Sequence, residues 1–162
     1  MPLPWDPSEP LDHALPSIGV DLRRCTGCHA CSVACKVEHN VPLGSFRLRV
    51  RWMEDPADGT MAFLPLFHGQ TCDLGADRGA VGMLPACVAA CPTAALVFGD
   101  EADDTGPLAD LIASGRTLRQ PGDARDDVVY RGLADWQEDR INAGVALHPD
   151  DADPIYEQGT GR

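Results

Sequence analysis

The spacing of the cysteines limits what this chain can fold into more than any other feature of its sequence. All of them lie between residues 25 and 91, at Cys25, Cys28, Cys31, Cys35, Cys72, Cys87 and Cys91. The first four form a C-x2-C-x2-C-x3-C run, and the last two form C-x3-C and are followed by Pro92. Cys72 begins the stretch CDLGADRG, in which Gly75 stands where the second cysteine of a C-x2-C pair is expected. The fold therefore has to place two dense groups of thiols, and one thiol beside an unfilled position.

The first run is typical of a cubane iron–sulfur site. Three thiols at two-residue intervals can each reach a different iron at one corner of a cluster, while the fourth lies one helical turn further on and faces away, toward a second cluster. A disulfide framework suits short secreted chains with an even number of cysteines. Structural zinc is usually bound by paired C-x2-C knuckles separated by a loop. Both alternatives fit this pattern poorly, so we predict iron–sulfur clusters.

The charge and hydropathy of the chain exclude some functions. Its formal net charge is -12 at pH 7, and most of the negative charge lies in the segments that flank the cysteine region. Such a surface repels phosphate backbones, so we expect no nucleic-acid partner. The acidic flanks are either a solvated surface or a docking surface for a basic partner. No apolar run approaches ~18 residues and the N-terminus lacks the pattern of a secretory signal, so we expect no direct membrane insertion and a cytoplasmic location.

Periodicity and turn residues predict a mixed α+β chain. We expect a proline-rich arm at 1–17, a cysteine-bearing domain at 18–100, a helix-strand extension at 101–133 and an acidic tail at 134–162. The predicted strands are 17–22, 46–52, 61–67, 95–98 and 127–133, and the predicted helices are 30–39, 85–91 and 107–115. The first two helices both carry cysteines at C-x3-C spacing, so the second half of the domain mirrors the first.

The stretch from 46 to 67 predicts a β-hairpin. Its first strand, FRLRVRW, alternates arginines with a row of apolar residues that we expect to be buried, namely Phe46, Leu48, Val50 and Trp52. The turn formers of EDPADGT lead into a return strand. Pro65 indicates that this return strand lies on the edge of a sheet.

Taken together, these motifs resemble the iron–sulfur electron-transfer subunits of the DMSO-reductase family of molybdenum and tungsten enzymes. The resemblance is carried by CTGCHACSVACKVEHNVPLG, FRLRVRW and CDLGADRGAVGMLPACVAACPTAALVFGD, and it covers roughly residues 18–133. It implies a ferredoxin-like dicluster fold, which is a pseudo-twofold βαβ repeat. The hairpin is then an insert between the two halves, and the acidic termini are extensions.

The resemblance also implies how two clusters share the cysteines. The family pattern assigns one [4Fe–4S] cluster to Cys25, Cys28, Cys31 and Cys91. It assigns the second cluster to Cys35, Cys72 and Cys87, with the remaining ligand expected at position 75. Because this chain has Gly75 there, the resemblance implies a [3Fe–4S] cluster at the second position. We predict that the substitution Gly75→Cys shifts this site toward [4Fe–4S].

Other ligands are the alternative at the second position. A second [4Fe–4S] cluster would need water or a non-cysteine side chain on its fourth iron, and Asp73 and Asp77 are the nearest carboxylates in the sequence. Three histidines also lie near the cysteines, at His29, His39 and His68. Histidines in such positions more often stay beside a cluster without binding it.

The resemblance implies an electron-transfer role with no catalytic residue in this chain. The expected partner is a molybdopterin or tungstopterin catalytic subunit. The further acceptor or donor is a membrane-anchor subunit, a haem subunit or a soluble electron carrier. Since the chain has cysteines for two clusters only, we expect a short relay. The alternatives are a free soluble dicluster ferredoxin that serves several partners and, less favoured, an enzyme that uses an open iron near Gly75. The resemblance also allows a periplasmic location, reached by export with a signal-bearing partner.

Overall fold

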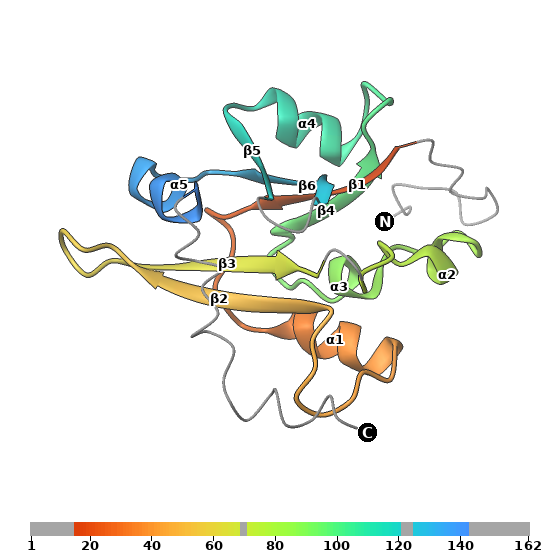
Figure 1. Cartoon of the computed structure of the whole chain (residues 1–162). Coiled ribbons are helices and arrows are strands. Elements are labelled where there is room, and N and C mark those ends of the chain that lie inside the picture. Colours follow the sequence, from red (N-terminus) through yellow and green to blue (C-terminus); the bar gives the residue numbers. More distant parts are fainter. Residues whose placement is uncertain (1–14, 69–70, 121–124, 143–162) are drawn as a thin grey trace.

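Two β-sheets form the framework of the molecule, with helices packed around them (Figure 1). The computed structural model describes residues 15–68, 71–120 and 125–142. In chain order the elements are β1 (Pro16–Asp21), α1 (Ala30–Glu38), β2 (Leu48–Glu54), β3 (Met61–Phe67), α2 (Ala76–Gly79), α3 (Ala86–Ala89), β4 (Leu96–Asp100), α4 (Pro107–Ala113), β5 (Thr117–Gln120), β6 (Arg125–Arg131) and α5 (Asp135–Asn142). The mixed α+β class predicted from the sequence is confirmed.

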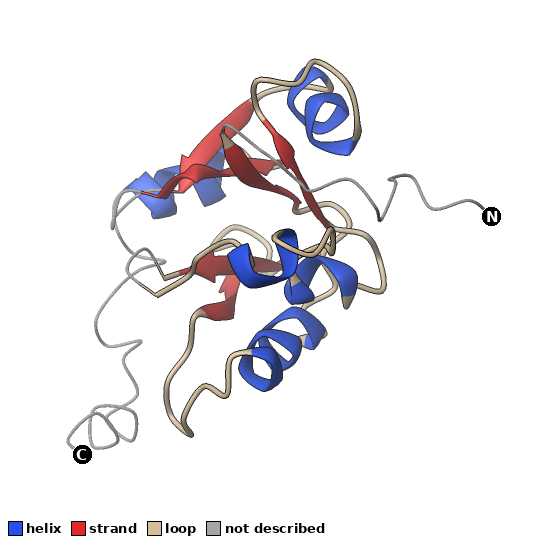
Figure 2. Ribbon diagram, turned by 90° about the vertical axis from the view of Figure 1, so that its right-hand side faces the viewer, coloured by secondary structure: helices blue, strands red, loops and turns tan. Residues whose placement is uncertain are grey.

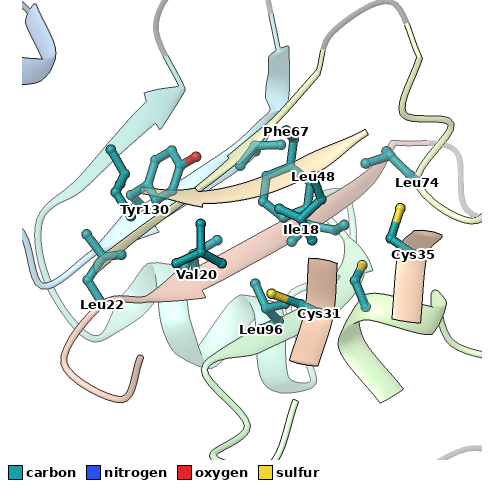
Figure 3. Close-up of a cluster of buried hydrophobic side chains, with 14 of the residues drawn as sticks. Ile18, Val20, Leu22, Cys31, Cys35, Leu48, Phe67, Leu74, Leu96 and Tyr130 are labelled. Carbon is teal, nitrogen blue, oxygen red and sulfur yellow. The ribbon is translucent and has the colours of Figure 1, made fainter. Parts of the chain in front are cut away.

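β1 lies inside the larger sheet, whose strand order is β4-β1-β6-β5. It pairs antiparallel with β4 and parallel with β6, and β6 pairs antiparallel with β5. α4 covers one face of this sheet, where Gly19 of β1 lets Leu108 and Leu111 approach closely (Figures 1 and 2). On the other face, Ile18 and Val20 are fully buried in the core that contains the cysteines (Figure 3). β1 thus runs between two packed layers and leads into the first cysteine run.

The predicted hairpin is present as the two-stranded sheet β2-β3, with Val50 opposite Pro65 and Glu54 opposite Met61. The part of the hairpin around Val50 packs on the core, where this side chain is buried. The expectation that Trp52 is buried is wrong, since this side chain is 65% exposed and Met53 faces the core instead. The covered side of β2 therefore changes between Val50 and Met53, so the alternation of the sequence does not by itself decide which side chains are covered along the whole strand.

A buried hydrogen-bond network joins the hairpin to the larger sheet. The amide of Phe67 donates to Gln120 Oε1 at 2.9 Å, and Gln120 Nε2 donates to the Phe67 carbonyl at 2.6 Å. The Tyr130 hydroxyl donates to Gln120 Oε1 at 2.7 Å and lies 2.5 Å from the Pro65 carbonyl. Tyr130 has no exposed surface, and burial raises its pKa well above the usual value. The segment after residue 101 therefore fixes the position of the hairpin.

The remaining elements differ from the prediction mainly in extent. α3 is shorter than the helix expected at 85–91, and α2, β5 and α5 are additional elements. α5 lies within the segment expected to be an acidic tail. Residues 1–14 of the expected arm and 143–162 of the expected tail lie outside the described residues. Across the described ranges, no helix has the length and apolar character needed to cross a membrane.

Candidate functional site

The first of two cysteine-lined cavities lies where the loop after β1, the start of α1 and the segment after α3 meet. It is lined by Cys25, Cys28, Cys31 and Cys91. Val50 and Pro65 of the hairpin and Leu96 of β4 contribute apolar walls. The fold thus gathers the four cysteines that the family pattern groups together, while their role as ligands of one cluster stays a prediction.

The loop that carries Cys25 and Cys28 depends on two residues with left-handed backbone. Gly27 has φ 68°, and a Cβ there would lie 2.3 Å from a ring carbon of Phe63 in β3. Only glycine lets the loop approach the hairpin this closely. His29 has φ 61° and is the N-terminal cap residue, directly before α1. The loop therefore turns back on the hairpin before the helix brings Cys31 to the same cavity.

The thiols of the first cavity differ in acidity. Burial raises the pKa of Cys25, and it raises the pKa of Cys31 to about 11. Burial also acts to raise the pKa of Cys91, but the amides of Leu96 and Ala95 help to outweigh it, and this pKa lies below the ordinary value. The Ala95 amide donates to Cys91 Sγ at 3.2 Å. Burial therefore makes the protons of Cys25 and Cys31 harder to displace by a metal, whereas the amides near Cys91 favour its thiolate form.

The second cavity gathers the three other cysteines around Gly75. Cys35 comes from the last turn of α1, Cys72 from the loop after β3 and Cys87 from α3. Burial, assisted by the charge of Cys72, raises the pKa of Cys35 to about 11 and raises that of Cys87 further. The grouping expected from the family pattern is thus also present in space, and ligation again stays a prediction.

The two cavities are adjacent because they share two helical segments. α1 presents Cys31 to the first cavity and Cys35 to the second, and the α3 segment presents Cys91 to the first and Cys87 to the second. Figure 3 shows the thiols of Cys31 and Cys35 aimed in different directions from the same helix. Residues four apart on a helix have Cβ atoms only about 5–6 Å apart. Groups bound in the two cavities would therefore be close neighbours.

The chemistry of the donors fits iron–sulfur clusters. Among the described residues, thiols and His29 are the groups in the first cavity best suited to bind a metal, and thiols are the majority donors in the second. Within 15–68, 71–120 and 125–142, no three His, Cys, Asp or Glu side chains are placed to hold one metal ion together. A cubane takes one thiolate on each iron, so its ligands stand around it instead of converging on a point.

Position 75 has no side chain, and a Cβ placed there would meet Pro85. Gly75 adopts left-handed backbone with φ 74°, which favours glycine. A Cβ at this position would lie 2.8 Å from the Cα of Pro85, the residue before α3. Because the obstacle is backbone, it cannot move aside as a flexible side chain would.

The carboxylate of Asp73 lines the same cavity and is held from two sides. Its Oδ1 accepts a hydrogen bond from the Gly75 amide at 3.0 Å, and its Oδ2 lies 3.1 Å from Nη2 of Arg47. Arg47 also donates from Nε to the Thr71 carbonyl at 2.5 Å. Burial opposes the charged form of Asp73, but the Gly75 amide and Arg47 outweigh it, so its pKa lies below the usual range. Asp73 is therefore an ionised group that is tied in place.

Of the other four alternative ligands, two line the cavities and two do not. His29 lines the first cavity and His39 lines the second. Asp77 lies in α2, and His68 directly follows β3. Neither is among the described residues that line the two cavities.

Sequence reasoning misses Arg47 and Pro85, which both line the second cavity. Arg47 is one of three alternating arginines in the predicted strand 46–52, and nothing in the pattern separates it from Arg49 or Arg51. Pro85 precedes a cysteine-bearing helix, where proline is common for purely local reasons. No local signal in the sequence identifies either residue as part of the cavity.

Comparison with known proteins shows similarity to the B subunits of several reductases. No family model matches the sequence. The B subunit of polysulfide reductase from Wolinella succinogenes is 27% identical over 61% of this chain and 83% of that protein. The B subunit of tetrathionate reductase from Archaeoglobus fulgidus is 40% identical over 51% of this chain. A protein of Halobacterium salinarum, named as a candidate iron–sulfur B subunit of dimethyl sulfoxide reductase, is 33% identical over 59% of this chain.

The alignments cover unequal shares of these relatives. The chain spans only 33% and 36% of the second and third proteins named above. Even so, all three are B subunits of reductases, and the resemblance predicted from the cysteine motifs is confirmed.

Proposed function

We propose that this chain, which resembles the iron–sulfur subunits of the DMSO-reductase family, is the electron-transfer subunit of a reductase complex. It passes single electrons between a molybdenum or tungsten pterin catalytic subunit and a further acceptor or donor. The observation that carries the proposal is the division of the cysteines between two adjacent cavities that share α1 and the α3 segment. Adjacent redox groups on one rigid support are what a short electron relay requires.

The first cavity suits a [4Fe–4S] cluster held by Cys25, Cys28, Cys31 and Cys91. The second suits a [3Fe–4S] cluster held by Cys35, Cys72 and Cys87, and the alternative is a second [4Fe–4S] cluster with a non-cysteine ligand. When bound, such clusters supply one-electron oxidation and reduction. The chain itself provides thiolates, apolar walls that limit access of water, and the Ala95 amide that donates to Cys91.

A ferredoxin-like dicluster fold is the arrangement that these contacts favour. β1 leads into the first cysteine run and α1, while α3 leads into β4, and β1 and β4 pair antiparallel. Each half gives most of its cysteines to one cavity and one cysteine to the other. This exchange supports a pseudo-twofold repeat with the β2-β3 hairpin inserted between its halves.

The proposal is tested by counting and identifying clusters in the anaerobically purified chain. We expect about seven irons per chain, a three-iron paramagnetic signal in the oxidised protein and a four-iron signal after reduction. In native cells we expect a larger pterin-containing oxidoreductase to co-purify with it. A colourless protein without iron would overturn the cofactor assignment, and a stable iron-loaded monomer with no such partner would overturn the subunit role.

A free soluble dicluster ferredoxin is the second candidate, and the acidic surface favours it. With a net charge of -12, weak docking to several partners would depend strongly on salt. A partner that stays bound through high salt counts against this candidate. For location we propose the cytoplasm, with the periplasm as the alternative if the complex is exported with a signal-bearing partner. Cell fractionation of the native host distinguishes the two.

A further inference from the structure

Two features of the second cavity at Gly75 both leave a cluster bound there without a fourth ligand. A side chain at position 75 would be strained, because the backbone is left-handed and its Cβ would meet Pro85. Asp73 is the one carboxylate among the described residues that line this cavity, and it is already engaged by Arg47 and the Gly75 amide. The corner therefore has no thiolate, and its nearest anionic substitute is restrained.

We propose that Arg47 decides which cluster the second cavity retains, by holding Asp73 so that its carboxylate does not bind a fourth iron. This inference rests on the proposed iron–sulfur function and extends it to a residue outside the expected ligand set. Arg47 is a positioning residue, which acts through Asp73. The contact between Arg47 and Asp73 thus helps to keep the site at three thiolate ligands, and the glycine at position 75 is only part of the cause.

The anchoring of Arg47 explains how it can restrain Asp73. Its side chain is only 18% exposed, and its Nε donates to the Thr71 carbonyl on the loop that carries Cys72. The guanidinium is planar with donors in a fixed arrangement, so a contact with Thr71 also sets the direction of the contact with Asp73. The Gly75 amide holds the other carboxylate oxygen. Binding of a carboxylate oxygen of Asp73 to iron would compete with these contacts, at a cost to a partly buried guanidinium.

The chemistry of conversion defines the test. A cluster reduced by dithionite to [3Fe–4S]0 and one ferrous ion would together have the composition and charge of [4Fe–4S]2+, so the conversion would need no further electron. The new iron needs a ligand at its outer position. A restrained Asp73 withholds that ligand, whereas a released Asp73 can supply a carboxylate oxygen, which is a favourable donor for iron.

The experiment compares full-length variants, purified anaerobically, reduced with dithionite and titrated with ferrous iron. We expect the three-iron signal of the unmodified protein to persist after reoxidation. In Arg47→Gln we expect it to be lost at a ferrous iron concentration at least about tenfold lower, since charge-assisted contacts to Asp73 are removed. The double variant Arg47→Gln with Asp73→Asn should behave like the unmodified protein, because the released group can no longer bind as a carboxylate.

Arg49→Gln is the matched control, because Arg49 is the next arginine of the alternating run and stays outside the described lining of the cavity. It should leave the titration unchanged, and circular dichroism checks that every variant is folded. The inference is overturned if Arg47→Gln titrates like the unmodified protein, if the double variant still converts, or if the unmodified protein already holds two four-iron clusters. Absence of any cluster from the unmodified protein would instead contradict the proposed function.

Discussion

The two cavities are built from the same helices but differ in the loops that complete them. In the first, four cysteines meet walls formed by Val50, Pro65 and Leu96. In the second, three cysteines share the wall with the charged pair Arg47 and Asp73. The loops differ in how they use left-handed backbone. Gly27 precedes a cysteine and lets its loop approach the hairpin, whereas Gly75 occupies the position where the ligand itself is missing.

This difference shows that the number of cysteines in a cavity does not decide whether a further thiol ligand can be added to it. Helical spacing sets Cys31 and Cys35 one turn apart along α1, so one helix can contribute to both cavities whichever loops complete them. Whether a corner can be filled depends on the backbone beside it, which at Gly75 lies against Pro85. The comparison leads to four predictions, in order of decreasing effect.

The largest effect is expected from removing one cysteine from each cavity. Cys28→Ser should lose the four-iron signal and about four irons, while Cys72→Ser should lose the three-iron signal and about three. These cysteines are chosen because neither is fully buried, so serine leaves the core intact. Iron analysis and low-temperature paramagnetic resonance measure the result. If either variant loses the signal assigned to the other cavity, the division of the ligands is wrong.

The next effect concerns the closed position at 75. Gly75→Ala should lower the free energy of unfolding by about 2–4 kcal/mol, because a left-handed alanine is strained and its Cβ meets Pro85. Gly75→Cys should lose as much and, in contrast to the expectation from the sequence, should gain no fourth iron in most molecules. Gly79→Ala is the control, since a Cβ there meets nothing within 4 Å and alanine favours the helix. Denaturant unfolding under anaerobic conditions compares the three, and a stable Gly75→Cys protein with about eight irons would refute the steric account.

A smaller effect is expected from weakening the contact between the hairpin and the larger sheet, and it should differ between the two cavities. Tyr130→Phe removes the hydroxyl that contacts the Pro65 carbonyl and Gln120. The buried groups left without this partner should lower the free energy of unfolding by about 1–3 kcal/mol. Because Pro65 lines only the first cavity of the two, the first cluster should bleach faster in air while the second does not. Equal acceleration at both sites would show that the hairpin protects them alike.

The smallest effect is expected at a site remote from both cavities. Two hydrogen bonds from Arg119 lower the pKa of Glu101, and Ser17 donates a further one at 2.6 Å. A carboxyl with a lowered pKa stabilises the fold above its ordinary value of 4.5 and loses that contribution as the pH falls through the folded value. Glu101→Gln should therefore cost roughly 0.5–1 kcal/mol near pH 7, with a difference that shrinks in acid. Unfolding curves measure this, and both cluster signals should stay unchanged.

Local patterns in the sequence predict a large part of this fold. Alternation finds β1 and the β2-β3 hairpin, and the absence of Gly and Pro finds α1, since these signals depend on residues a few positions apart. The same kind of signal fails for Trp52, because the covered side of β2 changes between Val50 and Met53, and this depends on what packs against the hairpin. It also fails for Gln120, whose role is to hold a strand more than fifty residues earlier in the chain.

The sequence by itself placed Cys31 and Cys35 one helical turn apart, and a family resemblance grouped the cysteines into two expected sets. It also marked Gly75 as the position without a ligand. Only the tertiary structure decided that Pro85 closes this position and that Arg47, among three similar arginines, engages Asp73. The reason is physical: spacing along the chain sets local direction, whereas contact between distant segments depends on how the hairpin, the helices and the sheet pack together.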